Sequence, residues 1–228
     1  MSRQTRLLAS ALGSWRDNFN SGFVDQGTVT GTLGVVHTLA NRDAISLSGQ
    51  GQMLSLDGKN FRTAAGATLR YTKRLEGDRA LSFSADWFRL DYKGQPLLDA
   101  NRFGASATYA GKVIYAGLGG GREQTVRRAA DHLSYTFING QVGAEQKLNE
   151  KLGLIAGLGV EYRNHDRTDP LFLKSRTDWR LDASIGLRVL IADRVTLRPR
   201  VTYTRNESNL KLYDYDRVTA SAAVRFEF

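Results

Sequence analysis

The sequence has no cysteine among its 228 residues. Disulfide bonds and metal sites built from thiolates are therefore excluded. Histidine is scarce as well, because only His37, His132 and His165 occur, and their wide spacing matches no metal-binding motif. We accordingly expect no metal and no cofactor.

Long apolar runs are also missing. No stretch comes near the roughly 18 consecutive apolar residues that a transmembrane helix requires. A hydrophobic content of 41% therefore excludes a helical membrane protein. The same content fits a β-barrel, in which only one face of each strand meets lipid.

What the sequence does contain is alternation with a period of two, clearest between residues 179 and 228. Over residues 179–191 every second residue is apolar, and the pattern repeats over residues 195–204 and 218–228. A period of two places the apolar and polar sets on opposite faces of a strand. Three strands are therefore predicted there, each with arginines on its polar face.

Strands of about ten residues with a continuous apolar face match a transmembrane barrel that has lipid outside and water inside. A soluble β-sandwich would alternate too, but its strands average about five to six residues. We predict an all-β fold, in which residues 1–228 form a single domain. The architecture is a transmembrane antiparallel up-and-down β-barrel of about 12 strands, within limits of about 10 to 14. The alternation slips beyond Asp86, where we expect a β-bulge, and again near Ile138.

The predicted connections alternate in length along the chain. Longer loops are expected at residues 18–26, 57–60, 93–101, 127–131, 168–174 and 209–214, and short turns at 40–43, 76–79, 111–112, 149–151 and 192–194. Short periplasmic turns and longer extracellular loops are typical of bacterial outer-membrane barrels. We therefore expect a protein of the Gram-negative outer membrane with both termini in the periplasm. Its lipid partners would include lipopolysaccharide.

No signal peptide is evident, because the apolar part of residues 7–15 is shorter than such a segment requires. An outer-membrane protein must first cross the inner membrane. We therefore expect this chain to be a mature or trimmed form of a longer one.

On the predicted polar faces, arginine is the residue type that points most clearly to a function. An arginine that faces lipid near mid-membrane costs about 2–4 kcal/mol, so these side chains belong in the lumen. The predicted lumen-lining arginines are Arg62, Arg70, Arg102, Arg163, Arg180, Arg188, Arg198, Arg200 and Arg225. Their candidate acidic partners in the lumen are Glu145, Glu161, Asp178, Asp182 and Glu227. Two interpretations stay open: an ion-paired network that braces the wall, and a basic lumen that favours anions or acidic segments.

The net charge of +9 raises nucleic-acid binding as a hypothesis. The 32 lysines and arginines are dispersed around the predicted wall and do not gather in one patch, so we expect no nucleic-acid partner. Small inward positions recur at Gly117, Gly119, Gly120, Gly121, Gly153, Gly157 and Gly159. No helix follows these glycines, so they are not a phosphate-binding loop. We expect them to leave room for bulky luminal side chains or an inserted segment.

Catalysis would be sought at Asn164-His165-Asp166, near a predicted extracellular strand end, where barrel enzymes that act on lipids place their chemistry. No serine nucleophile can be assigned beside this run from the sequence. We therefore do not expect an enzyme.

The chain also resembles known families at its carboxy-terminal part. Phe226 and the terminal Phe228 look like the assembly signal that the bacterial barrel-assembly machinery reads. The run from Tyr203 to Arg217 resembles the last hairpin of the surface lipoprotein assembly modifier family, in which a barrel follows tetratricopeptide-like repeats. Asp169-Pro170-Leu171-Phe172 resembles the preceding loop of that family, and residues 15–20 resemble the end of its first strand more weakly.

This resemblance covers residues 160–228 and implies a role in protein transport. Barrels of that family help to deliver lipoproteins, and in some members soluble proteins, across the outer membrane. The residues of this chain that would shape the last extracellular hairpin are Asn206, Ser208, Asn209, Tyr213, Asp214 and Arg217. The family barrel usually has about fourteen strands, and no helical repeat occurs in this sequence.

The leading functional hypothesis is thus the translocator domain of a protein or lipoprotein export system in the outer membrane, with an exported protein or lipoprotein as cargo. The alternative is a small porin-like channel with a basic, anion-favouring lumen. An autotransporter translocator fits the strand number, but the sequence lacks the expected helix before the barrel.

Overall fold

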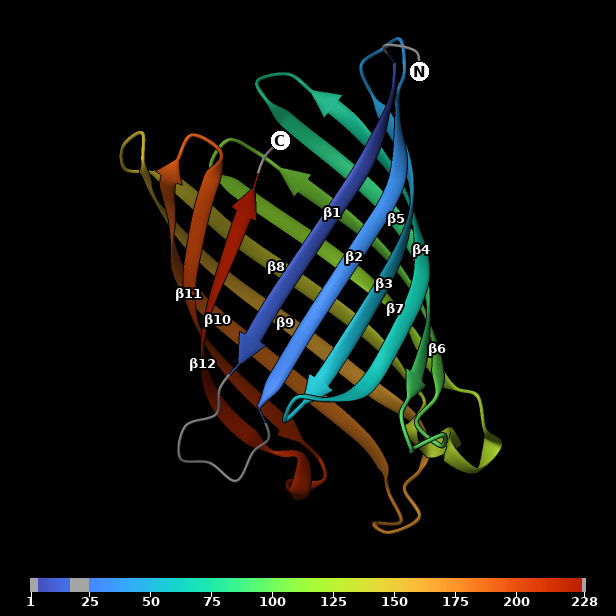
Figure 1. Cartoon of the computed structure of the whole chain (residues 1–228). Helices are drawn as coiled ribbons and strands as arrows, with labels where there is room; N and C mark the ends of the chain where they lie inside the picture. Colours follow the sequence, from blue (N-terminus) through green and yellow to red (C-terminus); the bar gives the residue numbers. More distant parts are fainter. Residues whose placement is uncertain (1–3, 17–24, 227–228) are drawn as a thin grey trace.

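The computed structural model describes residues 4–16 and 25–226. Within them, twelve strands form one antiparallel sheet in chain order, from β1 to β12 (Figure 1). The strands are β1 Thr5–Arg16, β2 Gln26–Thr38, β3 Ala44–Leu56, β4 Lys59–Leu75, β5 Arg79–Tyr92, β6 Ala100–Ala110, β7 Ile114–Thr125, β8 Tyr135–Lys147, β9 Leu152–Thr168, β10 Ser175–Ala192, β11 Val195–Ser208 and β12 Tyr215–Phe226. Every strand pairs with the next one along the chain. The prediction of an all-β, up-and-down arrangement of about 12 strands is confirmed.

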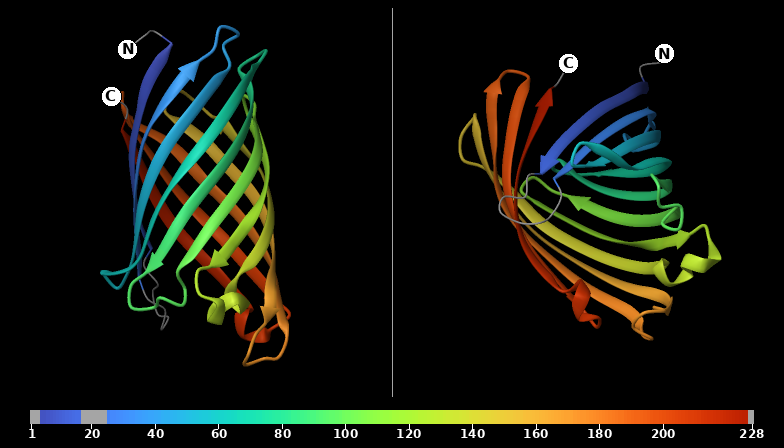
Figure 2. Two further views of the ribbon diagram at one scale, coloured as in Figure 1. Left: turned by 90° about the vertical axis from the view of Figure 1, so that its right-hand side faces the viewer. Right: turned by 60° about the horizontal axis from the view of Figure 1, so that its bottom comes forward.

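The two-residue alternation decides which face of the sheet each side chain takes. In β2, Val29 and Leu33 are 54% and 71% exposed on the outer face, while Thr30 and Thr32 point to the other side. Large apolar side chains recur at every second position around the outer wall, which suits a lipid environment. Figure 2 shows the sheet curled around an enclosed inner face.

The sequence-based expectation of irregular strands near Asp86 and Ile138 was wrong. The ladders that join β4 to β5, β5 to β6 and β8 to β9 show no register shift in the described residues. Phe88, Leu90 and Phe137 keep the alternation and face inward. The inner face is therefore not uniformly polar, which is why the sequence pattern looked irregular. Register shifts occur elsewhere, between Leu54 and Ser55 and near both ends of β10.

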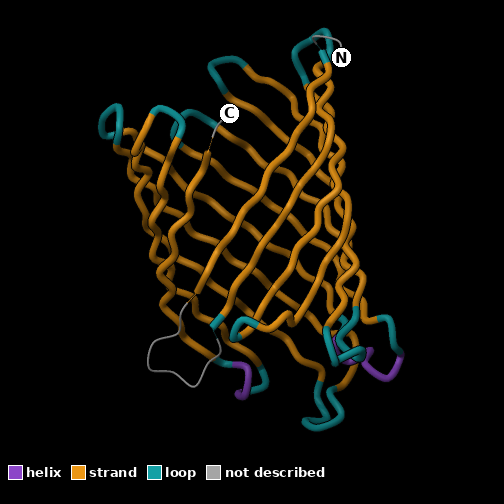
Figure 3. Tube along the Cα trace, in the orientation of Figure 1, coloured by secondary structure: helices purple, strands orange, loops and turns teal. Residues whose placement is uncertain are grey.

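The connections differ between the two ends of the sheet (Figure 3). One end, here called the terminal end, carries the start of β1, the end of β12 and only short turns. The opposite end, the loop end, carries longer connections with two short 3-10 helices, η1 Arg128–Leu133 and η2 Lys211–Tyr213. The exception at the loop end is the tight turn at Asp57 and Gly58, whose positive φ angles of 48° and 74° suit a two-residue hairpin. The long–short rhythm of the sequence thus corresponds to two different ends.

The two edge strands are neighbours in space, since β1 approaches β12 where the sheet curls round (Figure 1). The hydrogen-bonded ladders of the described residues run from β1 to β12 without a ladder between these two strands. Among residues 4–16 and 25–226, no helix is long and apolar enough to pass through a membrane.

One patch of apolar side chains packs together inside the sheet. Ala64, Leu90 and Ala100 are buried there, with Phe88 and Tyr92 packed against them. These five residues come from the loop-end halves of β4, β5 and β6. The rest of the described inner face is mainly polar, so most of the ordering comes from the ladders and from polar contacts between side chains.

Candidate functional site: the inner face of the sheet

The inner face carries the arginines that the sequence predicted for the lumen. The strand registers place eight of them on this face: Arg62, Arg70, Arg102, Arg163, Arg180, Arg188, Arg198 and Arg200. The structure describes only the backbone of Arg225 and Phe226, at the end of β12, while Glu227 and Phe228 lie outside the described residues. The predictions for the side chains of these four residues therefore lie outside the described part of the chain.

A continuous polar network crosses six strands on the loop-end half of this face. It begins at Arg102 of β6, whose guanidinium lies 3.7 Å from Glu123 of β7. Glu123 accepts a hydrogen bond of 3.0 Å from the hydroxyl of Tyr135 in β8. The guanidinium of Arg163 in β9 lies over the Tyr135 ring, 5.1 Å from its centroid. The inner wall is therefore braced from β6 to β9.

The network continues through Glu161, which is only 7% exposed. Its carboxylate pairs with Arg163 at 2.5 Å and with Arg180 of β10 at 3.6 Å. Arg180 also pairs with Asp182 at 3.0 Å, and Asp182 accepts a 2.6 Å hydrogen bond from Thr204 of β11. A buried carboxylate needs such partners, because desolvation of an unpaired charge is costly.

A second ion-paired group lies nearer the terminal end. Glu145 of β8 contacts Arg188 of β10 at 2.9 Å and Arg198 of β11 at 3.5 Å. One carboxylate therefore serves two guanidinium groups. This group retains a net positive charge.

Several inner arginines have no carboxylate partner in the described part of the chain. Arg70 and Arg200 have neither an ion pair nor a hydrogen bond there, and both are exposed toward the enclosed space. Arg62 bonds only to the neutral groups of Gln52 and Tyr92. Some inner arginines thus brace the wall through ion pairs, and others leave positive charge on the inner face.

Some charged residues of this face escaped the sequence analysis, among them Arg176, Arg217 and Glu123. Arg176 at the start of β10 pairs with Asp178 at 2.8 Å, and its guanidinium lies 3.6 Å from the centroid of the Tyr213 ring. Arg217 was assigned to a hairpin but lies inward in β12, and Glu123 was not assigned at all. The alternation of β7 contains the signal for Glu123, while the other two stand at strand boundaries that the pattern does not define.

Asp178 is almost fully buried beside His165 and Arg176. The Nε2 atom of His165 lies 3.7 Å from an Asp178 oxygen, and its Nδ1 lies 3.2 Å from the carbonyl oxygen of His132. The His165 ring also stacks on Tyr135 at 5.2 Å. This histidine is packed into the wall at the loop end, where it connects η1 to β9 and β10. In the described residues, no group of three or more His, Cys, Asp or Glu side chains could hold a metal.

The last loop-end hairpin, between β11 and β12, is held by polar side chains. Asn209 accepts a hydrogen bond from the Thr177 amide and donates one to the Ser175 carbonyl, while Asn206 donates to the Tyr213 carbonyl. Asp214 accepts a 2.6 Å bond from the Ser208 amide and lies 3.1 Å from the Lys211 ammonium. These two contacts lower the pKa of Asp214 below its usual range. Of the residues named from the resemblance, these contacts involve Asn206, Ser208, Asn209, Tyr213 and Asp214, whereas Arg217 lies within β12.

The predicted role of the inward glycines is confirmed at Gly121, and Gly143, which was not among the predicted glycines, acts in the same way. A Cβ atom at Gly121 would lie 2.8 Å from the Phe137 ring, and one at Gly143 would collide with the Tyr115 ring. Gly120, in contrast, faces outward. Small residues therefore let inward aromatic rings lie against neighbouring strands.

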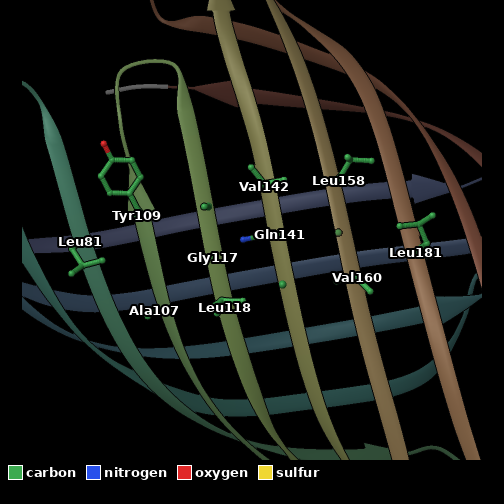
Figure 4. A pocket seen from close by; sticks show the side chains of 13 residues that line it. Leu81, Ala107, Tyr109, Gly117, Leu118, Gln141, Val142, Leu158, Val160 and Leu181 are labelled. Atoms are coloured by element: carbon green, nitrogen blue, oxygen red, sulfur yellow. The ribbon is translucent and has the colours of Figure 1, made fainter.

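A hollow of about 520 Å³ lies on the outer face across β5 to β10 (Figure 4). Leu81, Leu118, Leu158 and Leu181 are among its walls, and small residues such as Ala107 lie between them. No charged residue lines it. Its chemistry is that of the apolar outer wall, so we do not include it in the candidate site.

No protein-family model matches the sequence, and no curated protein matches it significantly. Solved structures do resemble the fold. A chain from a study of the in-meso crystallisation of membrane proteins has 13% identity and a TM-score of 0.55, over 97% of this chain and 84% of that one. The KdgM porin has 9% identity and a TM-score of 0.51, over 96% and 99% of the two chains. OccD3 (OpdP) of Pseudomonas aeruginosa has 8% identity and a TM-score of 0.50, over 96% and 68%.

Identities this low show the fold alone. The fold is that of bacterial outer-membrane β-barrels, which supports a location in the outer membrane.

Proposed function

We propose that this protein is a small porin-like channel whose basic inner face favours anionic solutes. The observation that carries the proposal is that several inner arginines, among them Arg62, Arg70 and Arg200, have no carboxylate partner in residues 4–16 and 25–226. Unneutralised charge on the wall of a narrow aqueous passage raises the local concentration of the opposite ion. The overall similarity to a porin over nearly the whole of both chains is consistent with this role. A passive channel needs no catalytic group.

Planar-bilayer recording tests this proposal. The purified full chain should give steady conductance steps, and a salt gradient of potassium chloride should give a reversal potential of the sign expected for chloride preference. The double variant Arg70→Gln, Arg200→Gln should move that potential toward zero. The control is Arg122→Gln, which removes an arginine that faces outward in β7. Absence of steps, or cation preference in the unmodified chain, would contradict the proposal.

A second candidate is the translocator domain of a protein or lipoprotein export system. It is supported by the last hairpin, where Asn206, Asn209 and Asp214, which were named from the resemblance to the surface lipoprotein assembly modifier family, hydrogen-bond to the backbone. A bilayer record with a closed or flickering pore would favour this candidate over the channel. Helical repeats encoded upstream of this segment in the same gene would favour it independently.

We also propose an orientation with the terminal end in the periplasm, and assembly by the barrel-assembly machinery through Phe226 and Phe228. The short turns of the terminal end support the orientation. Deletion of Phe228 should reduce the amount of folded protein in the outer membrane several-fold, and protease should cut the loop end in intact cells. Cleavage of the terminal end alone would reverse the orientation.

A further inference from the structure

A second hollow, of about 260 Å³, lies on the inner face over β3 to β6. It is here called the inner hollow, and it is lined by Gln50, Gln52, Arg62, Ala64, Phe88, Leu90 and Arg102. Its volume corresponds to about nine water molecules at about 30 Å³ each. The inner hollow therefore has room for a small organic molecule.

The inner hollow has a guanidinium group from each of the two strands that flank β5, Arg62 from β4 and Arg102 from β6. Arg62 donates a 2.8 Å hydrogen bond to the side-chain oxygen of Gln52, and its other terminal nitrogen lies 3.5 Å from the Tyr92 hydroxyl. The structure gives this guanidinium no carboxylate within ion-pair distance among the described residues, and its Nε is buried without a hydrogen-bond partner. Arg102, from the other side, is only loosely paired with Glu123 at 3.7 Å. No Asp or Glu is among the residues that line the inner hollow, so its lining carries two positive charges and no negative one.

Between these two arginines the inner hollow is apolar and holds an aromatic ring. Phe88 lies against Gly66 of the neighbouring strand, where a Cβ atom would collide with its ring. Leu90 and Ala64 are buried beside it at 5% and 8% exposure. The Phe88 ring lies directly against the backbone at Gly66 and forms, with Leu90 and Ala64, the apolar floor of the inner hollow.

Gln50 adds a neutral polar group. Its amide has no hydrogen-bond partner in the described residues, so it can donate to or accept from a bound molecule. The inner hollow thus presents two guanidinium groups, one free amide and a flat apolar floor within a small volume.

We infer that the inner hollow is a binding subsite for small aromatic carboxylates, in which guanidinium groups of Arg62 and Arg102 hold the carboxylate and Phe88 and Leu90 contact the ring. Arginine suits a carboxylate because its donors match the two oxygens, and offset aromatic contacts favour a ring. A bare inorganic anion would leave the apolar floor unused, and a sugar acid would place hydroxyl groups against it. This subsite rests on the proposed channel, since it would select among anions that pass through the lumen.

Ligand-observed NMR on the detergent-solubilised full chain tests the inference, with benzoate as the probe. Benzoate should bind in preference to benzamide, glucuronate and inorganic phosphate. Arg62→Gln should weaken benzoate binding about tenfold, the loss expected for a charge-assisted contact. Phe88→Leu should weaken it less, and Arg122→Gln, on the outer face of β7, should leave it unchanged. Circular dichroism would establish that each variant keeps its strands.

Three results would overturn the inference: equal binding of benzoate and phosphate, stronger binding of glucuronate, or benzoate binding that Arg62→Gln does not change. The channel is tested separately by chloride conductance. If the chain conducts chloride but does not bind benzoate, only the proposed subsite is wrong. If it binds benzoate through Arg62 but does not conduct, the proposed channel is wrong and the subsite stands.

Discussion

Tyr115 of β7 lies directly opposite Gly143 of β8, and its ring occupies the space that a Cβ atom at Gly143 would need. The ring is held on the inner face because its neighbour has no side chain. A larger residue there must displace the ring or push the two strands apart.

We therefore expect Gly143→Ala to destabilise the fold by about 1–3 kcal/mol, the usual cost of overpacking. The measurement is urea-induced unfolding in lipid vesicles, followed by tryptophan fluorescence. Gly51→Ala is the matched control, because a Cβ atom at Gly51 of β3 would meet nothing within 4 Å. Equal stability of the two variants would show that Tyr115 has another low-energy position.

Neutralising Glu145 should change ion selectivity in the opposite direction from the arginine variants. Glu145→Gln removes the carboxylate that Arg188 and Arg198 share, so the inner face gains positive charge. The preference for chloride should rise, and the reversal potential under a salt gradient should increase in size. Glu207→Gln, on the outer face of β11, is the control. A decreased preference for chloride would mean that Glu145 does not border the ion path.

The contribution of the turn before β3 to fold stability should decrease in acid. Asp43 is 4% exposed and accepts hydrogen bonds from the Tyr71 hydroxyl, the Arg74 amide and the Asn41 side chain. The Tyr71 hydroxyl is the main cause, and the Arg74 amide the next, of a pKa for Asp43 below its ordinary value of 3.8. Because the pKa of Asp43 is lower in the folded chain than in the unfolded chain, its carboxylate stabilises the fold fully at pH values above the unfolded-chain pKa. This stabilisation is lost as the pH falls below 3.8 and through the pKa of the folded chain.

Thermal unfolding between about pH 2 and pH 6 checks this prediction. The midpoint of the unmodified chain should fall more steeply below the ordinary aspartate pKa than that of Asp43→Asn. Asp78→Asn is the control, because the carboxylate of Asp78 has no partner in the structure as described. Parallel pH curves for the unmodified chain and Asp43→Asn would count against the assigned contacts.

Asn209 should determine the order of the last loop-end hairpin. Its side chain bridges the Thr177 amide and the Ser175 carbonyl, so Asn209→Ala removes both bonds at once. Hydrogen exchange over residues 210–214 should become about tenfold faster, as expected for the loss of one to two hydrogen bonds. Asn164→Ala, on the outer face of β9, is the matched control. Unchanged exchange in Asn209→Ala would show that Asn206 and Asp214 suffice.

Most of the strand arrangement could be predicted from the sequence, because alternation reports directly which side chains share an environment. Arg180 and Arg188 were placed inward on that basis, and the register puts them there. The pattern failed where the inner face is apolar. Phe88, next to Trp87, looked like a slip in phase, since a uniformly wet lumen would exclude it, but it packs inward against the buried Ala64, Leu90 and Ala100.

The pairing of charges could not be predicted in the same way. Arg102 meets Glu123 only because β6 and β7 align at one register, and the sequence does not fix that register. The same limit applies to Arg176, because its contacts with Asp178 and Tyr213 depend on where β10 begins and on how the next hairpin folds. Residues in mid-strand were therefore easier to place than residues at strand boundaries.

The connectivity of the sheet has a consequence for protein engineering. Each strand pairs with its chain neighbours, and the start of β1 and the end of β12 lie at the same end of the molecule (Figure 1). A circular permutant that joins the two original termini by a short linker and opens the turn at residues 193–194 would keep ten of the present ladders intact as hairpins and make β11 the first strand. In the permutant, β12 and β1 would follow each other in the chain. β11 would be the first strand and β10 the last.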